Sequence, residues 1–288
     1  MIPVFLTNIK TRDGLTLEGI IRHPKDKKRT ALIWIHGLTS HFSSSQKRSH
    51  AISDACIKNG IGFFMFNTRG ANVANLGGKK YSLIGTGFEN FKECTEDIHA
   101  MILTAKRLGY TRIILAGHST GANKALYYLY KRTNHAVKGL ILLGPASDID
   151  LELTWRSEGG QNGRLAIAKR LYKKDRKALM PARFGLLSAK RYISLYTPGS
   201  AEDVFPYYNP RATWKELKSI RIPVAVIFGA SDACIMKPRT TEKLIALFKE
   251  KSLQAKSFTG INISGTGHSF KKKELALATA ITRWIQKN

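Results

Sequence analysis

The sequence contains the stretch Arg112-Ile113-Ile114-Leu115-Ala116-Gly117-His118-Ser119-Thr120-Gly121. Its apolar first half predicts a buried strand over residues 112–116, and residues 122–132 have the spacing of a helix. The G-x-S-x-G pattern between them is typical of a nucleophile elbow when a strand and a helix flank it in this way. A turn this tight strains the serine backbone, while the glycines let strand and helix approach closely. The stretch therefore predicts Ser119 as a nucleophile at the carboxyl edge of a sheet; the alternative is a glycine-rich turn without chemistry.

The segments on either side of this stretch alternate between apolar runs and helical spacing. Short apolar strands separated by helices predict an α/β fold with a mostly parallel sheet and helices on both faces. Near the N-terminus, Asp13-Gly14 between two extended segments is a strong hairpin signal. Residues 71–87, rich in glycine and asparagine, are predicted to form a loop. The predicted strands cover 4–9, 15–22, 31–35, 61–66, 112–116, 137–143, 223–228 and 256–263, and the predicted helices cover 46–59, 88–108, 122–132, 239–250 and 271–286.

The alternation is interrupted after the strand predicted at residues 137–143. The interruption contains a basic helical stretch over residues 165–179 and an aromatic-rich segment over residues 192–208. A gap of this length inside a compact domain is usually functional. We therefore expect an α/β core formed by residues 1–147 and 218–288, with residues 148–217 inserted as a helical cap over the strand ends.

A catalytic serine needs partners, because its hydroxyl is a weak nucleophile until a base accepts the proton. Around an elbow of this kind the acid and then the histidine follow the serine along the chain. Asp232 lies just after a predicted buried strand, and His268 lies between the last predicted strand and the last helix. We expect His268 to act as general base and then general acid, with Asp232 fixing its tautomer. Asp148 and Asp150 are rival acids, and the alternatives are a surface histidine and a helix-capping aspartate.

The tetrahedral intermediate of such a reaction needs two backbone donors. One predicted donor is the N–H of Thr120, directly after the nucleophile, and the other is the N–H of Leu38, after the first buried strand. We expect His36 to orient the Leu38 loop in a structural role. His118 is interpreted as a packing residue, because side chains diverge around the tight turn.

The net charge of +27, from 47 Lys+Arg against 20 Asp+Glu, is unusually high for a chain of 288 residues. Such a field attracts anionic substrates, acidic surfaces, nucleic acid and phospholipid headgroups, but it says little about fold. Because the positive residues are spread along the whole chain, a solvated basic surface without a specific partner also accounts for it.

The three cysteines are Cys56, Cys94 and Cys234, without any CxxC spacing. This pattern favours neither a disulfide framework nor a zinc site, and it indicates a reducing compartment. The N-terminus lacks the basic region and cleavage site of a signal peptide, and no apolar run approaches the roughly 20 residues of a membrane-spanning helix. We therefore expect a soluble cytoplasmic protein that uses no cofactor and no metal.

Taken in order along nearly the whole chain, these motifs resemble the α/β-hydrolase superfamily. The motifs are His36-Gly37, Asn67-Thr68-Arg69-Gly70, the elbow, Gly229 to Asp232, and Gly267-His268. The resemblance implies an eight-stranded, mostly parallel sheet and a triad formed by Ser119, Asp232 and His268. The elbow and residues 189–203 are also similar to a hydrolase group that includes fungal siderophore esterases, whose members have such a cap. The loop at Ala71-Asn72 departs from many relatives, which have Gly-His or a similar pair there, so substrate specificity does not transfer.

These observations lead to an expected function with alternatives. The expected function is a serine esterase that cleaves a small carboxylic ester through an acyl-enzyme on Ser119. The same triad would serve an amide or peptide hydrolase or an acyltransferase, whereas a dehalogenase would have aspartate at position 119. A basic binding module for anionic polymers is the alternative from another class, although no nucleic-acid fold motif is present. A combined hypothesis is that the basic cap steers an anionic ester to the site. The polymer-binding and steering hypotheses both depend on basic residues with aromatic residues between them. These are Lys169, Arg170, Lys173, Lys174, Arg176 and Lys177, then Lys271, Lys272 and Lys273, with Tyr172 and Tyr192 interleaved.

Overall fold

The structure is a computed structural model of residues 1–288, and it describes all of them except residues 1–2, 26–28, 79–80 and 158–162 and the side chains of residues 155–157. Within the described residues, eight strands form one sheet in the order β1-β2-β4-β3-β7-β8-β9-β10. The strands are β1 Phe5–Lys10, β2 Thr16–Arg22, β3 Thr30–Ile35, β4 Gly62–Phe66, β7 Arg112–His118, β8 Val137–Leu143, β9 Val224–Gly229 and β10 Phe258–Ile263.

Only β2, the second strand of the N-terminal hairpin, runs against the direction of the other strands. β1 pairs antiparallel with β2, and β2 pairs antiparallel with β4, whereas all other neighbours are parallel. The hairpin turns at Gly14, whose φ of 90° favours a residue without a Cβ. The predicted eight-stranded, mostly parallel sheet of an α/β-hydrolase fold is therefore confirmed.

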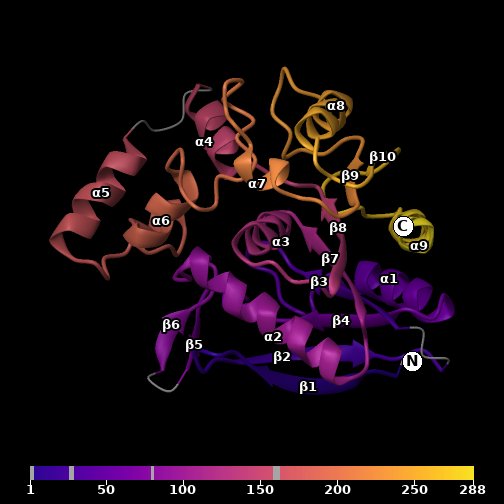
Figure 1. Ribbon diagram of the computed structural model, residues 1–288. Coiled ribbons are helices and arrows are strands. Elements are labelled where there is room, and N and C mark those ends of the chain that lie inside the picture. The colour runs from indigo at the N-terminus through magenta and orange to yellow at the C-terminus, as the bar shows by residue number, and fades with distance from the viewer. Residues whose placement is uncertain (1–2, 26–28, 79–80, 158–162) are drawn as a thin grey trace.

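Helices cover both faces of this sheet (Figure 1). On one face, α1 Gln46–Lys58 packs against α9 Glu274–Lys287 over a core that includes Trp34 and Phe63. On the other face, α2 Cys94–Arg107, α3 Thr120–Lys131 and α8 Thr241–Lys251 pack over a second core. Every residue of β4 and β9 is buried, which is the pattern of strands covered on both faces.

The segment between β8 and β9 carries most of the remaining helices. They are α4 Asp148–Ser157, α5 Arg164–Lys174, the short 3-10 helix η2 Ala182–Phe184, α6 Ala189–Tyr196 and the short α7 Lys215–Lys218. α5 and α6 lie together at the left of Figure 1 and enclose a small core of their own, built from Ala168, Met180, Ala189 and Tyr192. By contrast, Phe205, Tyr207 and Trp214 belong to the main core and pack against Phe248 of α8.

Most predicted elements agree with the structure to within three residues, and three predictions differ by more. Residues 71–87 are not all loop, because β5 Asn75–Gly77 pairs with β6 Ser82–Ile84 in a small separate hairpin. The predicted helix over residues 88–108 begins only at Cys94, after the 3-10 helix η1 Phe91–Glu93. The N–H groups of Phe88 and Glu89 both donate to the Gly85 carbonyl, at 3.0 and 2.8 Å, so a turn occupies the start of the predicted helix.

The basic helical stretch predicted over residues 165–179 ends at Lys174. Asp175 has an extended backbone, and Leu179 forms an isolated β-bridge with Ser188. These contacts outweigh the helical spacing of the sequence. Among the described residues, no helix is long and apolar enough to cross a membrane.

Candidate active site

Ser119 stands at a sharp turn between β7 and α3. Its backbone has φ 56° and ψ −130°, a region that a residue with a side chain rarely adopts. The turn depends on its glycines, because a Cβ on Gly117 would lie 2.2 Å from the carbonyl oxygen of Gly121. A Cβ on Gly121 would lie 2.2 Å from the carbonyl oxygen of Ile35. The strained, tightly packed turn has the geometry of a nucleophile elbow.

Asp232 and His268 lie together on two loops at the same edge of the sheet. The His268 Nδ1 is 3.0 Å from both carboxylate oxygens of Asp232. The loops are held together where the Ser231 N–H donates to the Thr266 carbonyl at 3.0 Å. Gly144 leaves room for the pair, because a Cβ there would lie 3.1 Å from the His268 Nδ1. Since the carboxylate accepts from Nδ1, the Nε2 of a neutral ring is left as the proton acceptor.

The environment of His268 changes its affinity for protons. Burial of the ring by itself lowers the pKa, because burial disfavours the charged form. Hydrogen bonds to Asp232 and Cys234 and the negative charge of Asp232 outweigh burial, so the pKa of His268 is raised above its ordinary value. The ring is therefore a stronger base than an isolated histidine.

His268 contacts His118, the residue directly before Ser119. The ring centroids of His118 and His268 are 4.9 Å apart, which places His268 beside the elbow. Within the described residues, the Ser119 hydroxyl makes no hydrogen bond, including none to His268. Catalytic hydrogen bonds are often long before substrate binds. The structure thus brings Asp232 to His268 and His268 to the elbow.

His118 is a packing residue, as the sequence indicated, and its ring nitrogen Nε2 also helps to hold the His268 loop. Its Nε2 donates to the backbone carbonyl of His268 at 2.8 Å. The Arg48 guanidinium donates to the next carbonyl, that of Ser269, at 3.2 Å. Burial and the nearby Arg48 charge hold the pKa of His118 well below its ordinary value, so its ring is neutral. Arg48 and His118 together fix the loop that presents His268, and nothing in the spacing of Arg48 indicated this contact.

The loop that carries Leu38 packs directly against the serine. A Cβ on Gly37 would lie 2.9 Å from the Ser119 Cβ, so only glycine permits this approach. In the part of the chain that the structure describes, the N–H groups of Leu38 and Thr120 donate to no protein acceptor. Free backbone donors beside a nucleophile are what an oxyanion hole requires.

His36 orients that loop. Its Nδ1 donates to the Gly37 carbonyl at 2.9 Å, and its Nε2 accepts from the Thr68 N–H at 3.0 Å. Burial first, and then the charge of Lys124, lower the pKa of His36 to about 4. The ring is therefore neutral, which matches these two hydrogen bonds.

The rival acids lie elsewhere. Asp150 forms an ion pair with Arg239 at 2.9 Å. Asp148 stands at the start of α4, where burial and then the charge of Glu202 raise its pKa to about 7. Within the described residues, neither carboxylate forms a hydrogen bond with His268. Of the three candidate acids in the described residues, only Asp232 is hydrogen-bonded to the imidazole.

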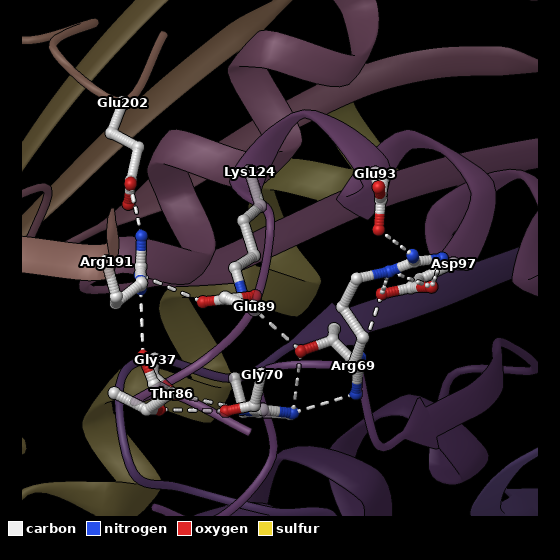
Figure 2. A network of polar contacts seen from close by, with 12 residues as sticks. Gly37, Arg69, Gly70, Thr86, Glu89, Glu93, Asp97, Lys124, Arg191 and Glu202 are labelled. Atoms are coloured by element: carbon white, nitrogen blue, oxygen red, sulfur yellow. Dashed lines mark hydrogen bonds and ion pairs between the residues drawn. The ribbon is translucent and has the colours of Figure 1, made fainter. Parts of the chain in front are cut away.

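A buried ionic network joins the insertion to this region (Figure 2). Arg191 of α6 donates to Glu89 at 2.9 Å and also pairs with Glu202. Glu89 accepts from Lys124 of α3 at 2.7 Å. Burial alone would raise the pKa of Glu89, but the charges of Lys124 and Arg191 outweigh it and lower this pKa. The Lys124 ammonium also donates to the Thr68 hydroxyl at 3.2 Å, and this hydroxyl lies 3.2 Å from the His36 Nε2. The network therefore extends from α6 to the Leu38 loop.

Cys234 also lies beside the imidazole. One sulfur, one nitrogen and one carboxylate oxygen of Cys234, His268 and Asp232 all lie within 4.8 Å of one another. The prediction from cysteine spacing favoured no metal site. It missed this cluster because His268 is far from Asp232 and Cys234 in the sequence. The only local signal was the Asp-x-Cys spacing after β9.

Solved structures with similar folds include three hydrolytic enzymes. The siderophore hydrolase EstB from Aspergillus fumigatus is 16% identical, with a TM-score of 0.72 over 100% of this chain and 98% of the other. A soluble variant of the monoglyceride lipase from Saccharomyces cerevisiae, in complex with a substrate analog, is 18% identical, with a TM-score of 0.66 over 100% of this chain and 95% of the other. Est1E from Butyrivibrio proteoclasticus is 17% identical, with a TM-score of 0.61 over 98% of each chain.

The sheet order, the strained elbow and these likenesses define a protein with the α/β-hydrolase fold, as the sequence predicted. More narrowly, the chain belongs to the family described as "Protein of unknown function (DUF1749)", whose sequence model matches residues 3–286. No protein with a curated description matches the sequence.

Proposed function

We propose that this protein is a serine hydrolase that cleaves carboxylic esters through an acyl-enzyme on Ser119. The observation that carries the proposal is the juxtaposition of a strained serine elbow with an imidazole hydrogen-bonded to a buried carboxylate. In this arrangement each residue of the pattern Ser119, Asp232 and His268 has a role in acyl transfer. The names of the similar structures, which include a siderophore hydrolase and a monoglyceride lipase, also favour ester chemistry.

The proposed reaction has two halves. His268 Nε2 accepts the Ser119 proton as the oxygen attacks the ester carbonyl, and Asp232 stabilises the imidazolium that forms. The N–H groups of Leu38 and Thr120 stabilise the oxyanion. The imidazolium then protonates the leaving alcohol, which gives the acyl-enzyme. In the second half, His268 activates a water molecule that releases the acid and restores Ser119.

The test is hydrolysis of p-nitrophenyl acetate and butyrate by the wild type and by Ser119→Ala. We expect the variant to lose activity by about 10⁴-fold or more, because the nucleophile is removed. Ser264→Ala is the matched control, since Ser264 is exposed and lies in the turn after β10. A fluorophosphonate label should attach to Ser119 and not to the Ser119→Ala protein. Equal rates for the wild type and Ser119→Ala would overturn the proposal.

We also propose that residues 148–217 form a cap whose charge steers anionic esters to the site. Its basic side chains Lys169, Arg170, Lys173, Lys174, Arg176 and Lys177 are all exposed. Tyr192 is buried and donates to Glu152 at 2.9 Å, so it is not available as the surface aromatic of a polymer-binding module. This observation favours steering of a small substrate over polymer binding.

Steering predicts that added salt lowers kcat/KM for an anionic ester more than for a neutral ester of the same size. Lys173→Glu combined with Lys174→Glu should weaken this salt response and leave the neutral ester unaffected. An identical response of the two esters in the wild type would contradict the steering proposal and leave the esterase proposal standing.

A further inference from the structure

Cys234 extends the Asp232–His268 pair into a set of three different donor atoms. Their donor atoms lie within 4.8 Å of one another. The Asp232 side chain is fully buried, the His268 side chain is 22% exposed and Cys234 is half-buried. The cluster is therefore rigid on its inner side and open to a small ion on its outer side.

Local hydrogen bonds hold the three donors in place. The Cys234 N–H donates to Asp232 Oδ1 at 2.9 Å, and the Asp232 N–H donates to the Gly229 carbonyl at 3.0 Å. The Ser231 contact to Thr266 ties this turn to the His268 loop. The donors thus belong to two loops that are already joined, so binding an ion costs little ordering of the backbone.

We propose that Asp232, Cys234 and His268 form a zinc site, and that zinc bound there inhibits the hydrolase. Thiolate, imidazole and carboxylate are the ligands that Zn²⁺ takes in proteins, and three of them leave a fourth position for water. The sulfur and nitrogen donors favour Zn²⁺ over Mg²⁺ or Ca²⁺, which prefer oxygen ligands alone. Zinc holds such donors at about 2.0–2.3 Å. His268 Nδ1 and the Asp232 oxygens are already 3.0 Å apart, so the main movement on binding is the approach of the Cys234 sulfur to this pair.

Inhibition follows from the atom of His268 that faces the cluster. Nδ1 carries the proton that the Asp232 carboxylate accepts, and zinc must replace this proton to bind there. The proton displaced from Nδ1 is transferred through solvent to Nε2, so the ring stays neutral and carries its proton on Nε2 while Nδ1 binds zinc. The thiol of Cys234 gives up its proton to solvent in the same step, and no electron is transferred. With Nε2 protonated, the ring has no lone pair to accept the Ser119 proton.

Binding and inhibition are separable claims, since only inhibition rests on the proposed esterase function. The binding test uses Co²⁺ as a spectroscopic substitute for zinc in the Ser119→Ala protein, where hydrolysis plays no part. We expect one equivalent of Co²⁺ to give tetrahedral d–d bands and a sulfur-to-cobalt charge-transfer band, both displaced by Zn²⁺. The charge-transfer band should be absent in Cys234→Ala and present in the control Cys56→Ala, because Cys56 is buried away from the cluster.

The inhibition test measures p-nitrophenyl butyrate hydrolysis with added ZnCl₂ and then with excess EDTA. We expect zinc to inhibit the wild type reversibly. Cys234→Ala should hydrolyse the ester without zinc. The zinc concentration that inhibits it should be about 10-fold higher or more, because even residues that only hold the metal ligands in place change metal affinity by that factor. Cys56→Ala should match the wild type.

Three results would overturn the inference. They are the absence of a charge-transfer band in the Ser119→Ala protein, equal zinc inhibition of wild type and Cys234→Ala, and activation by zinc in place of inhibition. A wild type that is no more active than Ser119→Ala would instead contradict the esterase proposal, and the cobalt spectrum would still decide whether the site exists.

Discussion

Two arginines, Arg69 and Arg191, form buried ionic clusters that differ in their contact with water (Figure 2). Arg69 is 3% exposed and donates to the fully buried Asp97 at 2.8 Å. Its other carboxylates, Glu93 and Asp13, are 48% and 39% exposed. Arg191 is fully buried, and its partners Glu89 and Glu202 are 0% and 4% exposed.

The difference shows how each cluster is used. The Arg69 cluster joins the first hairpin to the region around α2, and its outer carboxylates on Glu93 and Asp13 are partly exposed to water. The Arg191 cluster joins α6 of the insertion to Glu89, and neither of its carboxylates is in contact with water to a comparable extent. Loss of a partner is costly where the remaining charge cannot reach water and mild where it can. We therefore expect loss of Arg191 to lower the free energy of unfolding more than loss of Arg69.

The largest effect is expected for Arg191→Met, which leaves Glu89 and Glu202 without their guanidinium. We expect the free energy of unfolding to fall by about 4–5 kcal/mol, the upper range for breaking a buried ion pair. Urea unfolding followed by circular dichroism measures this. Lys190→Met on the same helix is the control, because Lys190 is exposed and should change stability by less than about 0.5 kcal/mol. Equal losses of stability for Arg191→Met and Lys190→Met would contradict a stabilising role of the buried Arg191 ion pairs.

Arg69→Met should have a smaller effect. Asp97 loses its guanidinium but still accepts the backbone N–H of residue 69 at 2.9 Å, so it keeps one donor. We expect a loss of about 3 kcal/mol, the lower end of the range for a broken buried pair. The same urea experiment measures it. A loss larger than that of Arg191→Met would show that exposure of the outer carboxylates does not set the cost.

Thr68→Val tests whether the Arg191 cluster extends to the Leu38 loop. The hydroxyl accepts from Lys124 at 3.2 Å, and its removal leaves that buried ammonium with one acceptor fewer. We expect a loss of about 1–2 kcal/mol. In a double-mutant cycle, Thr68→Val should couple to Lys124→Met by at least about 0.5 kcal/mol. Strict additivity would mean that the contact carries no energy.

Asp13→Asn should have the smallest effect, less than about 1 kcal/mol, because solvent screens this exposed carboxylate. Partial burial opposes its ionisation, but Arg69 outweighs burial and lowers the pKa of Asp13 below the ordinary 3.8. A lowered pKa contributes stability above pH 3.8, and the contribution is lost as the pH falls through the folded-state pKa. The difference from wild type should therefore shrink below about pH 4, measured by thermal unfolding across pH. A difference that grows on acidification would contradict the sign of this shift.

The fold and the proposed catalytic residues could be predicted because their signals are local. Ser119, Asp232 and His268 each follow a short apolar strand, and parallel strands end at one edge of a sheet. The pairing of Arg191 with Glu89 has no such signal, because helical spacing says nothing about which charge a buried side chain will meet. The hairpin of β5 and β6 was missed because each strand is too short to show alternation. Cys234 was missed because cysteine spacing was compared only with other cysteines.

The contacts from Arg191 through Glu89, Lys124 and Thr68 to His36 limit how the insertion can be exchanged between related proteins. An insertion transplanted without positions 89 and 124 would bring Arg191 into a site that lacks Glu89, one of its two carboxylate partners. The reverse transfer would leave Glu89 beside a helix with no cation. The insertion is therefore not a self-contained module, and recombination among relatives must carry at least these core positions with it. We expect charges at 89, 124 and 191 to change together during divergence.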